Sequence, residues 1–125
     1  MIEQSVYEAL TTCPSIITIT TAARIYPVTI PTNSAYPALT FRISQTQESP
    51  TLDTSGLEKL RFQIDSWGSD YFSAANLRAT LVAAFSGYQD ADFTAFLHNK
   101  ADFFEEDLLA YRCVSEFLIE SSSLN

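Results

Sequence analysis

One stretch, residues 60–85, constrains the fold of this chain more than any other. Its first part, Leu60 to Trp67, alternates apolar and polar side chains, which is typical of a strand with one buried face. Gly68 interrupts the alternation, and Ser69 or Asp70 then offers an N-cap for a helix. The stretch therefore predicts a strand followed by a helix that packs on it. The packing stripe of that helix has apolar residues at helical spacing: Ala74, Leu77, Leu81 and Phe85.

Weaker patterns predict elements on the N-terminal side. Residues 2–12 are expected to form an amphipathic helix that ends before Pro14. The run 15–21 is rich in β-branched residues, which disfavours a helix and predicts an irregular or short extended segment. Residues 24–31 contain Pro27 and Pro31, so they are expected to form either an edge strand or a plain surface arm.

Three more strands are expected besides residues 60–67, one before this stretch and two after it. Strands are expected over 36–46, 93–100 and 108–121, and the last is apolar on both sides, as in a central strand. The helix over 70–86 is expected to end at Gly87 in the left-handed conformation. The chain therefore predicts one α+β domain over residues 1–125. Its sheet would be small and mostly antiparallel, with about four strands and two main helices packed on one face.

Three segments are expected to lie outside this regular structure. Residues 45–58 are polar and aperiodic between two strands, which predicts a long, protruding and flexible hairpin loop that orders on contact with a partner. Residues 101–107 are expected to form a loop dense in acids, and residues 122–125 a loose tail. Trp67 falls on the polar face of its strand, where an indole either anchors a partner or is covered by the arm around Tyr26.

Composition argues against several classes of function. A net charge of −8 with seven scattered Lys and Arg residues argues against general affinity for duplex DNA. One histidine and two distant cysteines, Cys13 and Cys113, are too few ligands to predict a metal or cofactor site. The sequence also contains no phosphate-loop or hydrolase motif. The sequence therefore predicts a protein that is not an enzyme. Without a long apolar run or a signal peptide, it is expected to fold in a cytoplasm and to contact no membrane.

Four short motifs follow one another along the chain: Val6-Tyr7-Glu8-Ala9-Leu10, Arg24-Ile25-Tyr26-Pro27 with Pro31, Tyr36-Pro37-Ala38-Leu39-Thr40-Phe41 with Ile43-Ser44, and Arg61-Phe62-Gln63-Ile64-Asp65-Ser66-Trp67. Their order and spacing resemble the tail-completion (tail-terminator, head-to-tail joining) family of long-tailed phages, and gene transfer agents carry similar proteins. The resemblance implies a virion protein of the tail or neck, assembled in the host cytoplasm. Such a protein forms a ring, commonly a hexamer, that caps the tail tube. Its implied partners are itself, the tail-tube protein and the head-tail connector or stopper protein, while DNA passes through without specific binding.

A ring with a DNA conduit suggests roles for particular residues. Each subunit of a closed ring presents two different faces, and the arm and the long loop are the candidates for them. The candidate interface residues are Arg24, Tyr26, Pro27, Gln47, Glu48, Leu52, Asp53 and Trp67. An acidic lumen repels phosphate, so Glu105, Glu106 and Asp107 are candidates for its lining. The alternatives are a dimeric regulatory or small-ligand-binding domain and, less favoured, a hydrolase with converging carboxylates.

Overall fold

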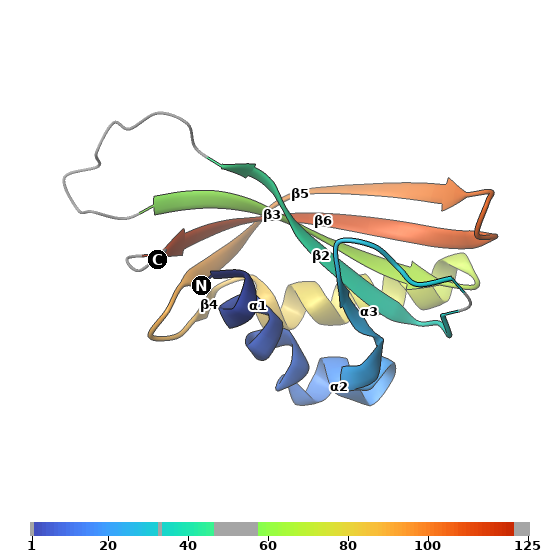
Figure 1. The fold of residues 1–125 in the computed structure, drawn as a ribbon, viewed down its shortest axis with the longest axis horizontal. Helices are drawn as coiled ribbons and strands as arrows, with labels where there is room; N and C mark the ends of the chain where they lie inside the picture. The colour runs from blue at the N-terminus through green and yellow to red at the C-terminus, as the bar shows by residue number, and fades with distance from the viewer. Residues whose placement is uncertain (1, 33, 47–57, 122–125) are drawn as a thin grey trace.

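The computed structural model describes residues 2–32, 34–46 and 58–121 (Figure 1). Six strands form one sheet in the order β1-β2-β3-β6-β5-β4. The helices are α1 (Ile2–Thr11), α2 (Pro14–Thr20), the 3₁₀ turn η1 (Ala22–Arg24) and α3 (Tyr71–Phe85). The strands are β1 (Ile25–Pro27), β2 (Ala38–Thr46), β3 (Glu58–Gly68), β4 (Tyr88–Gln89), β5 (Thr94–Glu105) and β6 (Ala110–Ser121).

The predicted α+β class is confirmed, but the expected sheet of about four antiparallel strands is too small. The sheet is mixed, because β1 runs parallel to β2 while the other neighbours are antiparallel. Strands β1 and β4 have three and two residues, which is too short for an alternation of side chains to be recognised. Strand β6 lies between β3 and β5, so its prediction as a central strand is confirmed, as is the edge position of residues 25–27.

The run 15–21 was expected to be irregular or extended, and this expectation is wrong. Pro14 opens α2 at its first position, where a missing N–H costs nothing. The Thr18 hydroxyl donates to the Pro14 carbonyl at 2.7 Å. Ile16 is fully buried in the core. Burying such a side chain contributes about 1.5–3 kcal/mol, whereas the helix penalty of a β-branched residue is below about 0.7 kcal/mol, so packing decides the conformation.

The acidic segment 101–107 was expected to be a loop, but most of it is strand. β5 continues to Glu105, and only residues 106–109 turn before β6, which begins at Ala110. Asp102 pairs with Arg78 on α3, and Glu105 pairs with Arg112 on β6. These partners neutralise two of the acids, and no local sequence pattern could reveal them.

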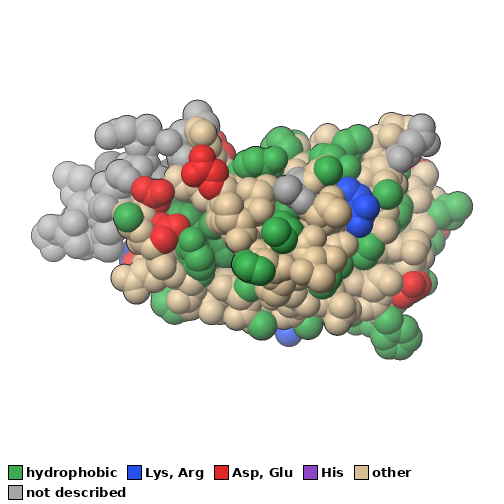
Figure 2. Space-filling view, turned by 90° about the horizontal axis from the view of Figure 1, so that it is seen from below, with side chains coloured by type: hydrophobic (Ala, Val, Ile, Leu, Met, Phe, Trp, Pro, Cys, Tyr) green, Lys and Arg blue, Asp and Glu red, His purple; other side chains and the backbone are tan. Residues whose placement is uncertain are grey.

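The helices cover one face of the sheet and leave the other without a helix (Figure 1). The predicted stripe of α3 is buried at all four positions. Leu77, Leu81 and Phe85 share one core cluster with Phe62 and Ile64 of β3 and Phe117 of β6. Asp70 caps α3 by accepting from the Ser73 N–H at 2.9 Å. Figure 2 shows this covered side from below, where hydrophobic side chains are spread among neutral polar ones and charged side chains are few. The contacts described next lie on the other face and along β5.

Candidate assembly surface

The helix-free face of the sheet carries the polar residues of β2, β3 and β6. The strand register places Arg42 opposite Gln63, Thr40 opposite Asp65, and Trp67 between Ala38 and Arg112. These residues belong to three strands, so only the folded sheet brings them together. The face is mainly polar and ends at the indole of Trp67, and Thr40, Asp65 and Trp67 are buried on it.

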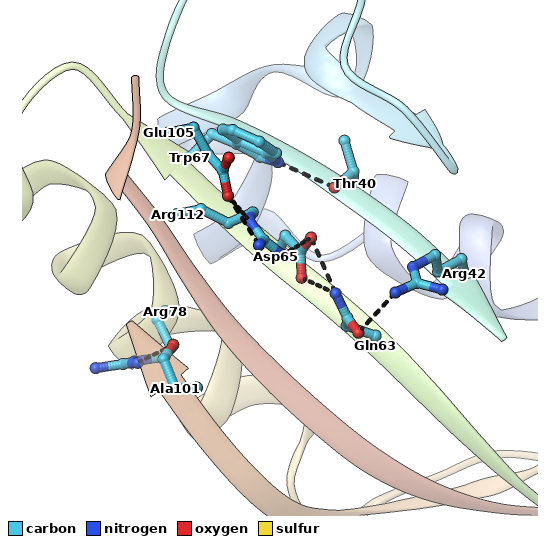
Figure 3. Close-up of polar contacts among 9 residues, drawn as sticks. All are labelled: Thr40, Arg42, Gln63, Asp65, Trp67, Arg78, Ala101, Glu105 and Arg112. Atoms are coloured by element: carbon cyan, nitrogen blue, oxygen red, sulfur yellow. Dashed lines mark hydrogen bonds and ion pairs between the residues drawn. The ribbon is translucent and has the colours of Figure 1, made fainter. Parts of the chain in front are cut away.

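Arg112 is the centre of the polar contacts on this face (Figure 3). Its guanidinium lies 2.8 Å from Glu105 Oε1 and 3.3 Å from Asp65 Oδ2. Gln63 donates to Asp65 Oδ1 at 2.9 Å and accepts from Arg42 at 3.0 Å. The chain of contacts therefore links β2, β3, β6 and the end of β5.

Asp65 is the most deeply placed acid of this network. Burial raises the pKa of its carboxyl above the ordinary value, and the Gln63 hydrogen bond and the Arg112 charge only partly oppose that rise. The carboxylate is held by two neighbours rather than presented to solvent. This geometry suits a structural ion pair better than a proton-transfer group.

Trp67 is covered by the chain's own arm. It is only 7% exposed, and Tyr26, Ile30 and Tyr36 pack against its cluster. Its indole N–H donates to the Thr40 hydroxyl at 3.0 Å. Of the two roles that the sequence left open for Trp67, the structure shows the covered one, so Trp67 becomes available to a partner only if the arm moves.

Arg24 fastens the base of this arm. Its Nε donates to the Pro37 carbonyl at 2.9 Å and its Nη2 to the Ile19 carbonyl at 3.1 Å. Tyr26 shares a hydrogen bond of 3.1 Å with the Ser34 hydroxyl, and Pro27 ends β1. These three predicted interface residues thus shape the arm, with Pro27 exposed on it.

A second cluster lies on the helix side of β5. Asp102 pairs with Arg78 and accepts from the Tyr71 hydroxyl at 3.1 Å. Partial burial would raise the pKa of the Asp102 carboxyl, but the hydrogen bonds from Arg78 and Tyr71 outweigh it and hold the pKa below its ordinary value. The Phe104 and Tyr111 rings meet at 4.9 Å, and Tyr71 packs on Tyr111 at 6.1 Å. This cluster leaves exposed aromatic surface beside an ion pair.

The predicted lumen residues separate into two kinds. Glu105 is engaged by Arg112, with its Oε1 2.9 Å from Arg112 Nε. Glu106 and Asp107 are exposed in the turn between β5 and β6, followed by Leu109 at 74% exposure. The predicted interface residues of the long loop lie outside the described residues: Gln47, Glu48, Leu52 and Asp53.

Arg112 and Arg78 were not singled out from the sequence. Each is an isolated basic residue in an acidic chain, and that rarity is the one signal that marks them as partners for acids. Across residues 2–32, 34–46 and 58–121, no three His, Cys, Asp or Glu side chains are grouped as metal ligands would be. None of the described helices is both long and apolar enough to cross a membrane.

Comparison with known proteins gives two findings. A family model described as "Tail completion protein gp17" matches residues 4–119. A chain in a solved structure titled "Virion of native gene transfer agent (GTA) particle" has a similar fold, with a TM-score of 0.72 at 14% identity, over 93% of this chain and 90% of that chain. Among curated proteins, none matches this sequence.

Proposed function

Because the chain belongs to the tail completion protein gp17 family, we propose that it forms a ring that caps the tail tube of a phage or gene transfer agent and joins the tail to the head connector. Membership of this family makes the chain a structural protein of such a tail. The observation that carries the proposal is the family match over residues 4–119. The similar chain in a gene transfer agent virion supports it through the fold.

The architecture supports a ring of identical subunits, for which we propose six. In a closed ring, one face of each subunit meets a different face of its neighbour. The sheet has two unlike edges: the short β1 ended by Pro27, and the long β5 that β4 covers only at its start. Two unlike edges suit a head-to-tail arrangement.

We propose that the arm at residues 24–31 and the long loop take part in contacts with neighbours. Arg24, Tyr26 and the buried Trp67 would hold the arm in shape, and Pro27 would be its exposed contact. Gln47, Glu48, Leu52 and Asp53 remain candidates on the loop. The partners would be other copies, the tail-tube protein and the connector or stopper protein.

We propose that the turn after β5 faces the conduit. Glu106 and Asp107 are exposed there, and acids repel DNA phosphate, so the genome would slide past without specific binding. Glu105 would act differently, because its carboxylate is paired with Arg112. It would position the hairpin that carries the other two acids.

Deletion of the gene in a particle-producing strain tests the function. The expected result is filled heads and tails that fail to join, seen by electron microscopy, with joining restored by a plasmid copy. Mass spectrometry of finished particles should detect the chain. Normal, joined and infectious particles without the chain would refute the proposal.

A further inference from the structure

The outer edge of β5 is open over most of its length. β4 pairs only with Thr94 and Ala95, and the Leu97 N–H is taken by the Ser86 hydroxyl at 3.1 Å. Beyond these contacts, no described strand lies on this side of β5 as far as Glu105. A long open edge is a template for pairing with another chain.

In the open segment of β5, alternate residues direct their backbone N–H and C=O groups away from β6. A register shift between Leu97 and Asn99 marks a bulge. After it, the Lys100 N–H bonds to the side chain of its neighbour Asn99 at 2.9 Å, so it is not directed at β6. Alternation along an antiparallel strand then directs the backbone groups of Asp102 and Phe104 to the same outer side.

The opposite edge of the sheet has a free segment of similar length. β1 covers β2 only at Leu39–Phe41, and the Val28 N–H closes that contact on the Phe41 carbonyl at 2.9 Å. The rest of β2, residues 42–46, has no described strand on its outer side. Because direction reverses at each step from β2 through β3 and β6 to β5, β5 runs opposite to β2. A copy in the same orientation would therefore pair its β2 antiparallel to β5.

Charge favours this pairing. The turn after β5 carries the exposed acids Glu106 and Asp107, whereas Asp102 and Glu105 are already paired with Arg78 and Arg112, and Lys100 stands at the other end of the open segment. Arg42 is the one charged residue of β2. The neighbouring β3 carries Lys59 and Arg61 together with Glu58 and Asp65, and Arg61 is paired with Glu116. Antiparallel pairing of residues 100–104 with 42–46 brings Arg42 of the next copy to the acidic end and away from Lys100. Opposite charges near one another add specificity to such a contact.

Exposed aromatic surface borders the open edge. Phe103 and Phe104 are 47% and 48% exposed on opposite faces of β5. A monomer commonly protects such an edge with charge, a bulge, proline or a covering segment, as Pro27 does at the end of β1. On β5, the bulge after Leu97 and the charge of Lys100 protect the start of the open segment, and Asp102 within it is paired with Arg78. The β5 edge combines open backbone with exposed rings, as an interface does.

We propose that the β5 edge at residues 100–104 is the surface on which a second copy of this chain docks head-to-tail through its β2 segment 42–46. The two sheets then continue into one another, and Phe103 and Phe104 are covered at the junction. This inference rests on the proposed ring and names the contact that closes it. The same contact repeated in one direction yields a ring and not a two-fold dimer.

Two substitutions, Lys100→Pro and Lys100→Ala, test whether the backbone of β5 pairs with β2 of the next copy. Lys100→Pro removes an outward N–H that serves no neighbouring strand, and Lys100→Ala removes the same side chain but keeps the N–H. Both variants should keep the melting temperature of the parent within a few degrees. In sedimentation velocity at the highest soluble concentration, the parent and Lys100→Ala should form oligomers and Lys100→Pro should stay monomeric. A parent that stays monomeric, or a Lys100→Pro variant that assembles normally, overturns the proposal.

Disulfide trapping tests the direction of the contact. The double variant Arg42→Cys with Phe103→Cys, two positions on the helix-free face of the sheet, should give a ladder of cross-linked chains on oxidation, because each copy then offers both halves of the junction. Each single variant should give no more cross-linking than the parent. Dimers from Phe103→Cys alone would indicate a two-fold β5–β5 contact and overturn the head-to-tail proposal, as would a double variant without a ladder. These tests use the purified chain, so the outcome is distinct from that of the particle-joining test.

Discussion

Arg112 on β6 lies over the ring of Phe103 on β5, with its guanidinium carbon 4.7 Å from the ring centroid. The same guanidinium holds Glu105 and Asp65. One side chain thus fixes the end of β5 against β6 and neutralises two acids. Phe103, on the proposed assembly edge, is held in place by this contact from within its own subunit.

Replacing Arg112 should destabilise the fold. Arg112→Ala leaves the buried Asp65 carboxylate without its cation, and we expect the free energy of unfolding to fall by about 2–3 kcal/mol, below the cost of breaking a fully buried pair because Arg112 is partly exposed. Urea unfolding followed by circular dichroism measures this. The double variant with Asp65→Asn should recover part of the loss. A single variant as stable as the parent would show that the ion pairs contribute little.

Acid should weaken the Asp102 contacts. The folded pKa of Asp102 lies below its ordinary value, so this carboxylate contributes stability above about pH 3.9, the usual unfolded value. That contribution is lost as the pH falls through the folded pKa. Asp102→Asn should therefore flatten the fall in melting temperature between about pH 5 and pH 2. Asp107→Asn, in the exposed turn, is the matched control and should leave the slope unchanged.

Gly68 should tolerate no side chain. A Cβ there would lie 2.6 Å from the backbone nitrogen of Ala74, so β3 and the start of α3 would have to separate. We expect Gly68→Ala to lower the free energy of unfolding by at least about 2 kcal/mol, as overpacking does. Gly87→Ala is the comparison: its φ of 83° strains alanine, but nothing lies within 4 Å of the added Cβ. Its expected cost is about 1–2 kcal/mol, and equal losses would contradict the close-approach argument.

The arm should control access to the single tryptophan. Trp67 is the only tryptophan in the chain and is covered by Tyr26, Ile30 and Tyr36, so its fluorescence should be blue-shifted and resist quenching by iodide. Arg24→Met removes both hydrogen bonds at the base of the arm and should increase quenching severalfold. Arg42→Met, an arginine outside the arm, is the control. Equal quenching in the two variants would show that Arg24 does not hold the cover in place.

Charge reversal in the turn should affect DNA passage without affecting the fold. Glu106→Lys with Asp107→Lys changes two exposed residues, and we expect joined particles of normal melting behaviour whose DNA ejection is slower. Glu105 is left unchanged because it holds Arg112. The neutral pair Glu106→Gln with Asp107→Asn should have a smaller effect. Unchanged ejection kinetics for the lysine variant would remove the lining role.

The periodicity of apolar residues predicted those features that are set within a single helix or strand. The alternation in Leu60–Trp67 and the stripe of α3 were predicted because a side chain's burial follows its position in a regular repeat. Local propensity failed at Ile16, where β-branched residues argued against a helix but packing of α2 outweighed propensity. It also failed at Asp102, because the acid's partner lies on another element.

The sequence by itself determined the α+β class, the position of the main strand-helix unit and the central place of β6, since these are written in the repeat of apolar residues. The tertiary structure alone decided that the arm covers Trp67, that β5 runs on through its acids, and that Arg112 meets Asp65 from 47 residues away. Contacts between distant residues depend on which strands become neighbours. That choice is made by the free energy of the whole packed sheet, and no short window of sequence contains it.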